Sequence, residues 1–129
     1  MEWCDLMLWQ FPMWWFGLPA TLKGWVDRTF ALGRVYDGKH LYKQGRFIGK
    51  RALLSLTTGA PESAYRPDGM NGDIAKLLYP VTHGVLPFVG FTVLPPHIVY
   101  APAHIGEDAR TEALAAYGRY LTGIAAETA

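Results

Sequence analysis

The sequence predicts one α/β domain over residues 1–129, with a parallel β-sheet and helices packed on both of its faces. Short apolar segments alternate along the chain with segments whose apolar residues recur at helical spacing, an order typical of parallel sheets. Half of the residues are hydrophobic, which excludes a disordered chain. Residues 6–22 and 77–106 contain no Asp, Glu, Lys or Arg, so buried elements are expected in both stretches.

The first strand is predicted at Leu6–Trp9, where every residue is apolar. A strand without polar alternation is typically covered on both faces, so a central parallel strand is expected. The next helix is predicted over residues 19–32, with Pro19 in its first turn and Gly33 as a left-handed C-cap. Its periodic residues are Leu22, Trp25, Val26, Thr29 and Phe30.

A second buried strand is predicted at Ala52–Leu56, with an exit loop at Thr57–Gly59. Helical spacing returns after Asp73, and Pro80 should kink or split this helix before Gly90 ends it. Two extended segments are predicted after this helix, at Phe91–Leu94 and at Ile98–Tyr100. A last helix is predicted at the end of the chain, with an apolar face formed by Leu114, Tyr117, Leu121 and Ile124.

Several functional classes lose support. A net charge of +1 gives no general attraction to nucleic acid, and prolines interrupt both charge-free stretches, so no membrane span is expected. The histidines and Cys4 lack metal-ligand spacing, so no metal site is expected, and neither a nucleophile elbow nor a phosphate-binding glycine motif is present. The single cysteine and the absence of signal-peptide features at Met1–Trp3 predict a cytoplasmic protein.

An aromatic loop, Gln10–Pro19, directly follows the first predicted strand. Open parallel sheets bind ligands at the carboxyl ends of their strands, so this loop suggests a site for a planar aromatic ligand. The alternative is that Trp14, Trp15 and Phe16 are core residues. The loop Thr57–Ala60 should leave the next strand at the same edge, either as a plain turn or as a segment whose backbone N–H groups approach a ligand.

Five stretches that together span nearly the whole chain carry a likeness to a known family: Gln10–Arg28, Gly49–Gly59, Tyr65, Gly69–Asp73 and Tyr79–Pro95. In these stretches the sequence resembles the flavodoxin-like NAD(P)H:quinone oxidoreductases. The resemblance implies a flavodoxin-like parallel sheet. It also implies that the first two strands and the phosphate-binding loop of the family are lacking, because no equivalent segments precede Met1.

The resemblance implies a flavin cofactor, FAD or else FMN, bound along the two loops. In the family, the loop equivalent to Pro12–Gly17 lies along the flavin ring through its main chain, and Trp15 and Phe16 would be walls of the nicotinamide and quinone pocket. The loop equivalent to Thr57–Ala60 contacts the pyrimidine end of the ring. The implied cofactor-binding residues are Pro12, Met13, Trp14, Trp15, Phe16, Thr57, Thr58, Gly59 and Ala60.

Tyr65 and Asn71 are the catalytic positions that the resemblance implies. Tyr65 corresponds to the family's active-site tyrosine, which stabilises charge on the reduced flavin. Asn71 stands where a histidine often assists that tyrosine. An amide donates a hydrogen bond but does not become a cation near neutral pH, so a proton relay would depend on Tyr65 and water. We expect altered kinetics rather than lost chemistry.

The segments that the resemblance expects before Met1 affect both the sheet and the cofactor site. In a sheet ordered 2-1-3-4-5, this chain would supply only the last three strands. Leu6–Gln10 would then present an unpaired apolar edge that a partner or a further segment must cover. The loop expected to hold the flavin phosphate would also be absent, so weak flavin binding is predicted for the isolated chain.

The function that the resemblance implies is two-electron, ping-pong hydride transfer from NAD(P)H through the flavin to a quinone, in a homodimer. Two alternatives stay open. The chain is either a non-catalytic relic that serves dimerisation or interaction, with weak or no flavin binding, or a domain that binds planar apolar ligands without redox turnover. The absent phosphate loop and Asn71 favour the relic over the enzyme.

Overall fold

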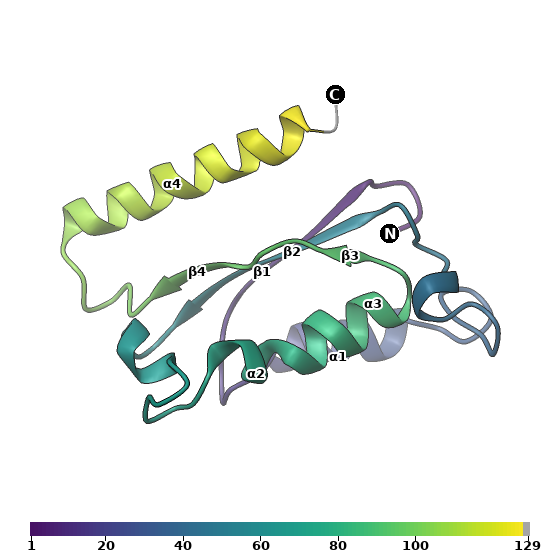
Figure 1. The fold of residues 1–129 in the computed structure, drawn as a ribbon, viewed down its shortest axis with the longest axis horizontal. Helices are drawn as coiled ribbons and strands as arrows, with labels where there is room; N and C mark the ends of the chain where they lie inside the picture. Colours follow the sequence, from purple (N-terminus) through teal and green to yellow (C-terminus); the bar gives the residue numbers. More distant parts are fainter. Residues whose placement is uncertain (128–129) are drawn as a thin grey trace.

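The computed structural model describes residues 1–127 and contains a parallel four-stranded sheet between two helical layers (Figure 1). Helices α1 (Ala20–Thr29), α2 (Ile74–Tyr79) and α3 (Leu86–Phe88) cover one face. Helix α4 (Glu107–Ala126) lies over the other face. The predicted α/β architecture with helices on both faces of the sheet is confirmed.

Strand β2 (Arg51–Thr58) is the centre of the sheet and pairs in parallel with each other strand of residues 1–127. Strand β1 (Leu6–Pro12) lies on one side of β2. Strands β3 (Thr92–Val93) and β4 (His97–Tyr100) follow one another along its other side. Ala52–Leu56 are all buried, as predicted for a strand with two covered faces.

β1 differs from its prediction, because only one of its faces is covered. Met7, Trp9 and Phe11 are buried against the helical layer, whereas Leu8 is 37% exposed and Gln10 is also exposed. Among the described residues, β1 pairs only with β2, so it is the unpaired edge that the resemblance implied and not the central strand that its apolar run predicted. α4 contacts β2, β4 and the turn before β4, which leaves the outer face of β1 open. An apolar run in the sequence does not reveal that a face is open.

α1 is shorter than the predicted helix. It is capped by Phe30, whose ring packs against Trp9 and Trp25 with centroid distances of 6.4 and 5.9 Å. Gly33 has a positive φ of +86°, as predicted, but its N–H donates to the carbonyl oxygen of Tyr36 and closes a later turn. The helix therefore ends at the packed residue Phe30, before it reaches the C-cap predicted at Gly33.

The kinked helix predicted after Asp73 is confirmed. The Asp73 carboxylate caps α2 by accepting a hydrogen bond from the Ala75 N–H at 2.9 Å. A π-helical segment, η3 (Pro80–Val85), begins at the proline, which has no N–H to donate within a regular helix. Gly90, with φ +106°, follows α3 and turns the chain towards β3.

α4 covers the sheet unevenly. Ile124 is buried, and Tyr117 and Leu121 are half-buried, as expected for the predicted apolar face. Leu114 is 72% exposed, so its predicted place on a packed face is wrong. The physical reason is a pocket that separates the amino-terminal half of α4 from the sheet.

Candidate functional site

The carboxyl ends of β1, β2 and β4 lie at one edge of the sheet. Pro12 is in register with Thr57, and Thr58 is in register with Tyr100. The N–H of Met13 donates to the carbonyl oxygen of Thr57 at 2.8 Å, which ties the aromatic loop to the exit of β2. The two predicted loops therefore lie side by side, where parallel sheets bind ligands.

The aromatic loop closes in a tight turn at Trp14–Gly17. Gly17 donates to the Trp14 carbonyl oxygen at 3.0 Å and accepts from the Trp14 N–H at 3.2 Å. Trp15 and Phe16 have φ values of +48° and +62°, a combination typical of a type I′ turn, where Asn and Gly are preferred and bulky residues are strained. Trp15 is 97% exposed and Phe16 49% exposed, so the alternative that they are core residues is wrong.

The backbone of both loops offers unused hydrogen-bond donors. Within residues 1–127, no acceptor receives a hydrogen bond from the N–H groups of Trp15, Phe16, Gly59 or Ala60. The hydroxyl of buried Thr58 donates to the carbonyl oxygen of Ala60 at 2.8 Å and thereby shapes the second loop. The Met13 side chain is buried, so only its backbone faces the site. Free N–H groups clustered at one edge suit a ligand with carbonyl oxygens or negative charge.

The segment after β2 carries the tyrosine singled out in the sequence. Tyr65 ends a short 3-10 helix, η2 (Glu62–Tyr65), and is 7% exposed. The Asn71 N–H donates to the carbonyl oxygen of Ala64 at 2.8 Å, which brings Asn71 back to this segment. Gly69 permits the return, because a Cβ there would lie 2.5 Å from the carbonyl oxygen of Ala64. Tyr65 and Asn71 are thus placed in one compact loop.

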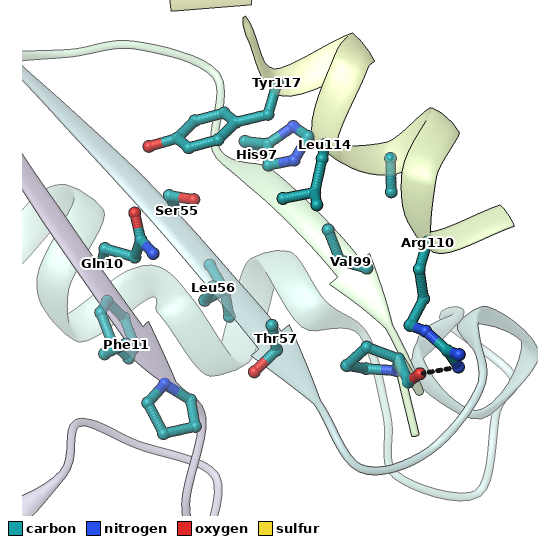
Figure 2. Close-up of a pocket in the computed structure, with 13 residues that line it drawn as sticks. Gln10, Phe11, Ser55, Leu56, Thr57, His97, Val99, Arg110, Leu114 and Tyr117 are labelled. Carbon is teal, nitrogen blue, oxygen red and sulfur yellow. Dashed lines mark hydrogen bonds between the residues drawn. The ribbon is translucent and has the colours of Figure 1, made fainter. Parts of the chain in front are cut away.

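A pocket of about 400 Å³ lies beside this edge, between α4 and the open face of β1 and β2 (Figure 2). Gln10, Ser55 and Thr57 line its floor on the sheet. The Tyr117 hydroxyl is buried and has no hydrogen-bond partner among residues 1–127. Its ring stacks on His97 at a centroid distance of 4.5 Å, and burial lowers the pKa of His97. This wall of the pocket is therefore a neutral imidazole and an unpaired phenol.

Arg110 is the residue at this edge that the sequence reasoning missed. Its guanidinium lines the pocket and donates to the carbonyl oxygen of Pro102 at 3.5 Å (Figure 2). It also donates to the carbonyl oxygen of Ile105 at 2.6 Å. In the described part of the chain it pairs with no carboxylate. A basic residue in the first turn of a helix opposes the helix dipole, and this was the available sequence signal.

The basic segment at residues 34–51 is engaged in contacts within the protein. Asp37 accepts hydrogen bonds from the Lys39 N–H and from the side chains of His40 and Arg46. The Lys39 N–H and the His40 side chain hold the pKa of Asp37 far below its usual range. Arg34 pairs with Glu2 at 3.0 Å. These contacts favour a solvated surface over a phosphate site.

A family model described as Flavodoxin-like fold matches residues 1–121. The chain belongs to this family. Its parallel sheet flanked by helices is the architecture found here, so the predicted flavodoxin-like fold is confirmed. No helix of residues 1–127 is long and apolar enough to cross a membrane. The same residues contain no cluster of three His, Cys, Asp or Glu side chains able to hold a metal ion.

Similar proteins include quinone-dependent dehydrogenases. NAD(P)H dehydrogenase (quinone) 1 of Cavia porcellus is 44% identical over 128 residues, which cover 99% of this chain and 46% of the relative. A Klebsiella pneumoniae structure described as a candidate quinone reductase has a TM-score of 0.85 and 36% identity, covering 95% of this chain and 51% of its own. General stress protein 14 of Treponema denticola, solved in complex with FMN, has a TM-score of 0.76 and 29% identity. The match covers 97% of this chain and 67% of the Treponema chain. The chain spans about half the length of the curated relatives it matches.

Proposed function

We propose that the chain is part of a flavin-dependent NAD(P)H:quinone oxidoreductase. The observation that carries this proposal is the sheet edge where an exposed aromatic turn and free backbone donors lie side by side. Relatives named for NAD(P)H and quinones, and a similar structure with FMN, support it. When bound, the flavin would accept a hydride from NAD(P)H and pass it to a quinone in a second half-reaction.

The residues at the edge fit a flavin ring. Trp15 and Phe16 offer exposed aromatic surface for stacking on a flat ring system. The free N–H groups of the two loops match the carbonyl oxygens and ring nitrogens of such a ligand. We assign Pro12–Phe16 and Thr57–Ala60 as the cofactor-binding segments, with Met13 acting through its backbone and Thr58 through loop shape. FAD is the cofactor we propose, with FMN as the alternative.

Two side chains complete the proposed chemistry. Tyr65 holds a proton at its hydroxyl and donates a hydrogen bond towards negative charge that develops on the ring. Arg110 supplies positive charge at the mouth of the pocket for an anionic group of the cofactor. Asn71 is placed in the Tyr65 loop and can donate from its amide, but it carries no proton between ring and solvent.

Tyr65→Phe is expected to slow flavin reduction by NAD(P)H about ten-fold, because one hydrogen bond to a charged group is worth about 1.5 kcal/mol. The measurement is single-turnover bleaching of the flavin absorbance under anaerobic conditions. The melting temperature should stay unchanged, since the Tyr65 hydroxyl makes no hydrogen bond within residues 1–127. Equal reduction rates in the two proteins would remove Tyr65 from the mechanism.

We propose that residues 1–129 form one partial flavodoxin-like domain whose open side receives a further strand and helix. The unpaired edge of β1 would accept the strand. The part of the pocket away from Arg110 would accept the helix, since exposed Leu114 offers it apolar contact and the unpaired Tyr117 hydroxyl offers it a hydrogen bond. This proposal explains why Leu8, an apolar residue on the open face of the sheet, is partly exposed to solvent.

β1 amides in the isolated chain are expected to exchange with solvent at least about ten-fold faster than those of β2, because edge strands open locally at lower free energy. Hydrogen exchange followed by mass spectrometry measures this difference. Equal protection of the two strands would show that the β1 edge is already covered. The mass of the chain in solution would then tell whether a second copy covers it.

We also propose a cytoplasmic homodimer. Exposed aromatic side chains on the helical face, Tyr42 and Tyr79 at 45% and 56% exposure, are the surface that supports association. The single cysteine in the sequence supports a reducing compartment. Light scattering of the purified chain tests the dimer, and a monomer at all concentrations would contradict it.

A non-catalytic interaction module is the second candidate, and the open β1 edge favours it. Titration of the purified chain with FAD and with FMN separates the two functions. Quenched flavin fluorescence together with NAD(P)H consumption in the presence of a benzoquinone supports the enzyme. Absence of both at flavin concentrations far above those of the protein supports the interaction module.

A further inference from the structure

Packing, rather than hydrogen bonding, holds the proposed active-site tyrosine in place. The Tyr65 hydroxyl makes no hydrogen bond within residues 1–127, although the residue as a whole is only 7% exposed. Its aromatic neighbour is Tyr100, with ring centroids 6.0 Å apart and planes inclined at 37°. The direction in which the Tyr65 hydroxyl points therefore depends on what its ring packs against.

Tyr100 is anchored more firmly than Tyr65. It is the last residue of β4 and lies in register with Thr58 at the carboxyl edge of the sheet. The next residue, Ala101, is buried and donates its N–H to the carbonyl oxygen of Thr58 at 3.0 Å. Ala101 has a φ of +47°, so the chain turns away directly after Tyr100. A side chain placed by a strand and its closing turn gives precise support to a loop residue.

The surroundings of Tyr100 keep its phenol neutral. Burial, the negative charge of Glu62 and the neighbouring Tyr65 raise the pKa of Tyr100 above its ordinary value. Glu62 begins the short helix that Tyr65 ends, so the carboxylate and both phenols belong to one cluster. The Tyr100 ring therefore contacts Tyr65 without adding a phenolate next to the site where negative charge is to be stabilised.

We propose that Tyr100 is a positioning residue, whose ring holds Tyr65 in the orientation that directs the Tyr65 hydroxyl to the flavin. This inference rests on the proposed function of Tyr65 in flavin reduction. The contact is between rings, so phenylalanine at position 100 should suffice and an aliphatic residue should not. Because Tyr100 acts through Tyr65, its effect should vanish once the Tyr65 hydroxyl is removed.

The test is a double-mutant cycle of Tyr100→Leu and Tyr65→Phe in the full chain, with two measurements. The first is the rate of flavin reduction by NAD(P)H. Tyr100→Leu should lower this rate about five-fold when residue 65 is tyrosine and less than about two-fold when it is phenylalanine. The second is the midpoint potential of the bound flavin, which should fall by about 20 mV, the shift of a five-fold change in a two-electron couple.

Two control variants accompany the cycle. Tyr100→Phe should retain the rate and the potential of the original chain. Tyr120→Leu makes the same replacement on α4, where the Tyr120 hydroxyl donates to the carbonyl oxygen of Pro95 at 2.8 Å. It should change neither measurement.

The outcomes separate the positioning role from the function on which it rests. Equal effects of Tyr100→Leu in both backgrounds, or loss of rate in Tyr100→Phe, would overturn the positioning role while the original chain still reduces its flavin. Absence of flavin reduction in the original chain would overturn the proposed function, and the positioning role with it.

Discussion

Replacing Trp15 with Asn and Phe16 with Gly should weaken flavin binding at least about a hundred-fold, while raising the stability of the fold. Both residues have positive φ values in the turn that closes the aromatic loop. Bulky residues in this conformation cost about 1 kcal/mol or more each, and Asn-Gly is the preferred pair in such turns. Stacking on aromatic side chains is worth about 1–3 kcal/mol per ring, so losing both rings removes about 3 kcal/mol of binding.

The double variant separates stability from function in one protein. Its melting temperature should rise by about 8 °C, for a gain of about 2 kcal/mol from the two positions in a domain of this size. Flavin affinity is measured by fluorescence titration. Trp3→Asn is the matched control, because Trp3 is 89% exposed and precedes the amino end of β1, at the opposite edge of the sheet. A less stable double variant with unchanged affinity would contradict both roles of the turn.

Gly45→Ala should destabilise the fold by about 3 kcal/mol, as severe overpacking against backbone does. A Cβ at Gly45 would lie 2.5 Å from the Gly90 Cα and from the Val89 carbonyl carbon, and neither atom can move aside as a flexible side chain would. The close approach of the backbone at Gly45 to that at Gly90 is held by the Phe47 N–H, which donates to the Val89 carbonyl oxygen at 3.0 Å. The rings of Phe47 and Phe91 stack beneath it at 4.9 Å.

Thermal unfolding followed by circular dichroism measures this effect, with an expected fall of about 10 °C in melting temperature. Gly38→Ala is the matched control, because Gly38 lies in the same connection between α1 and β2 and a Cβ there would meet nothing within 4 Å. Similar melting temperatures for the Gly45 and Gly38 variants would show that the two backbones do not approach as closely as described.

The order of elements was predictable because local signals agreed with the fold. Ala52–Leu56 read as a doubly covered strand and is one, and Pro80 and Gly90 marked the kink and the end of the second helical region. The one-sided burial of β1 was not predictable from its apolar run, although the family resemblance implied an unpaired edge at Leu6–Gln10. Leu6–Trp9 is as apolar as the central strand, yet Leu8 faces an open side of the sheet. The hydrophobicity of a residue shows that it prefers burial, but the position of α4 decides whether a helix covers it.

The candidate site was predictable in position but not in geometry. The aromatic residues after the first strand pointed to the carboxyl edge, where the structure has them exposed. Nothing in their side chains predicted positive φ values, because bulky residues seldom adopt them. Arg110 and Tyr100 reach the edge through tertiary structure from distant parts of the chain. The place of Arg110 near the start of a helix was a weak signal, and no local pattern distinguishes Tyr100.

The proposed function requires that the two loops at the carboxyl edge hold a flavin that NAD(P)H reduces and a quinone reoxidises. Anaerobic mixing of the chain, loaded with excess FAD or FMN, with NAD(P)H tests it most directly when the visible absorbance of the protein-bound flavin is followed. We expect bleaching on mixing with NAD(P)H and full recovery on adding a quinone. A protein that takes up no flavin, or a bound flavin whose absorbance NAD(P)H leaves unchanged, would contradict it.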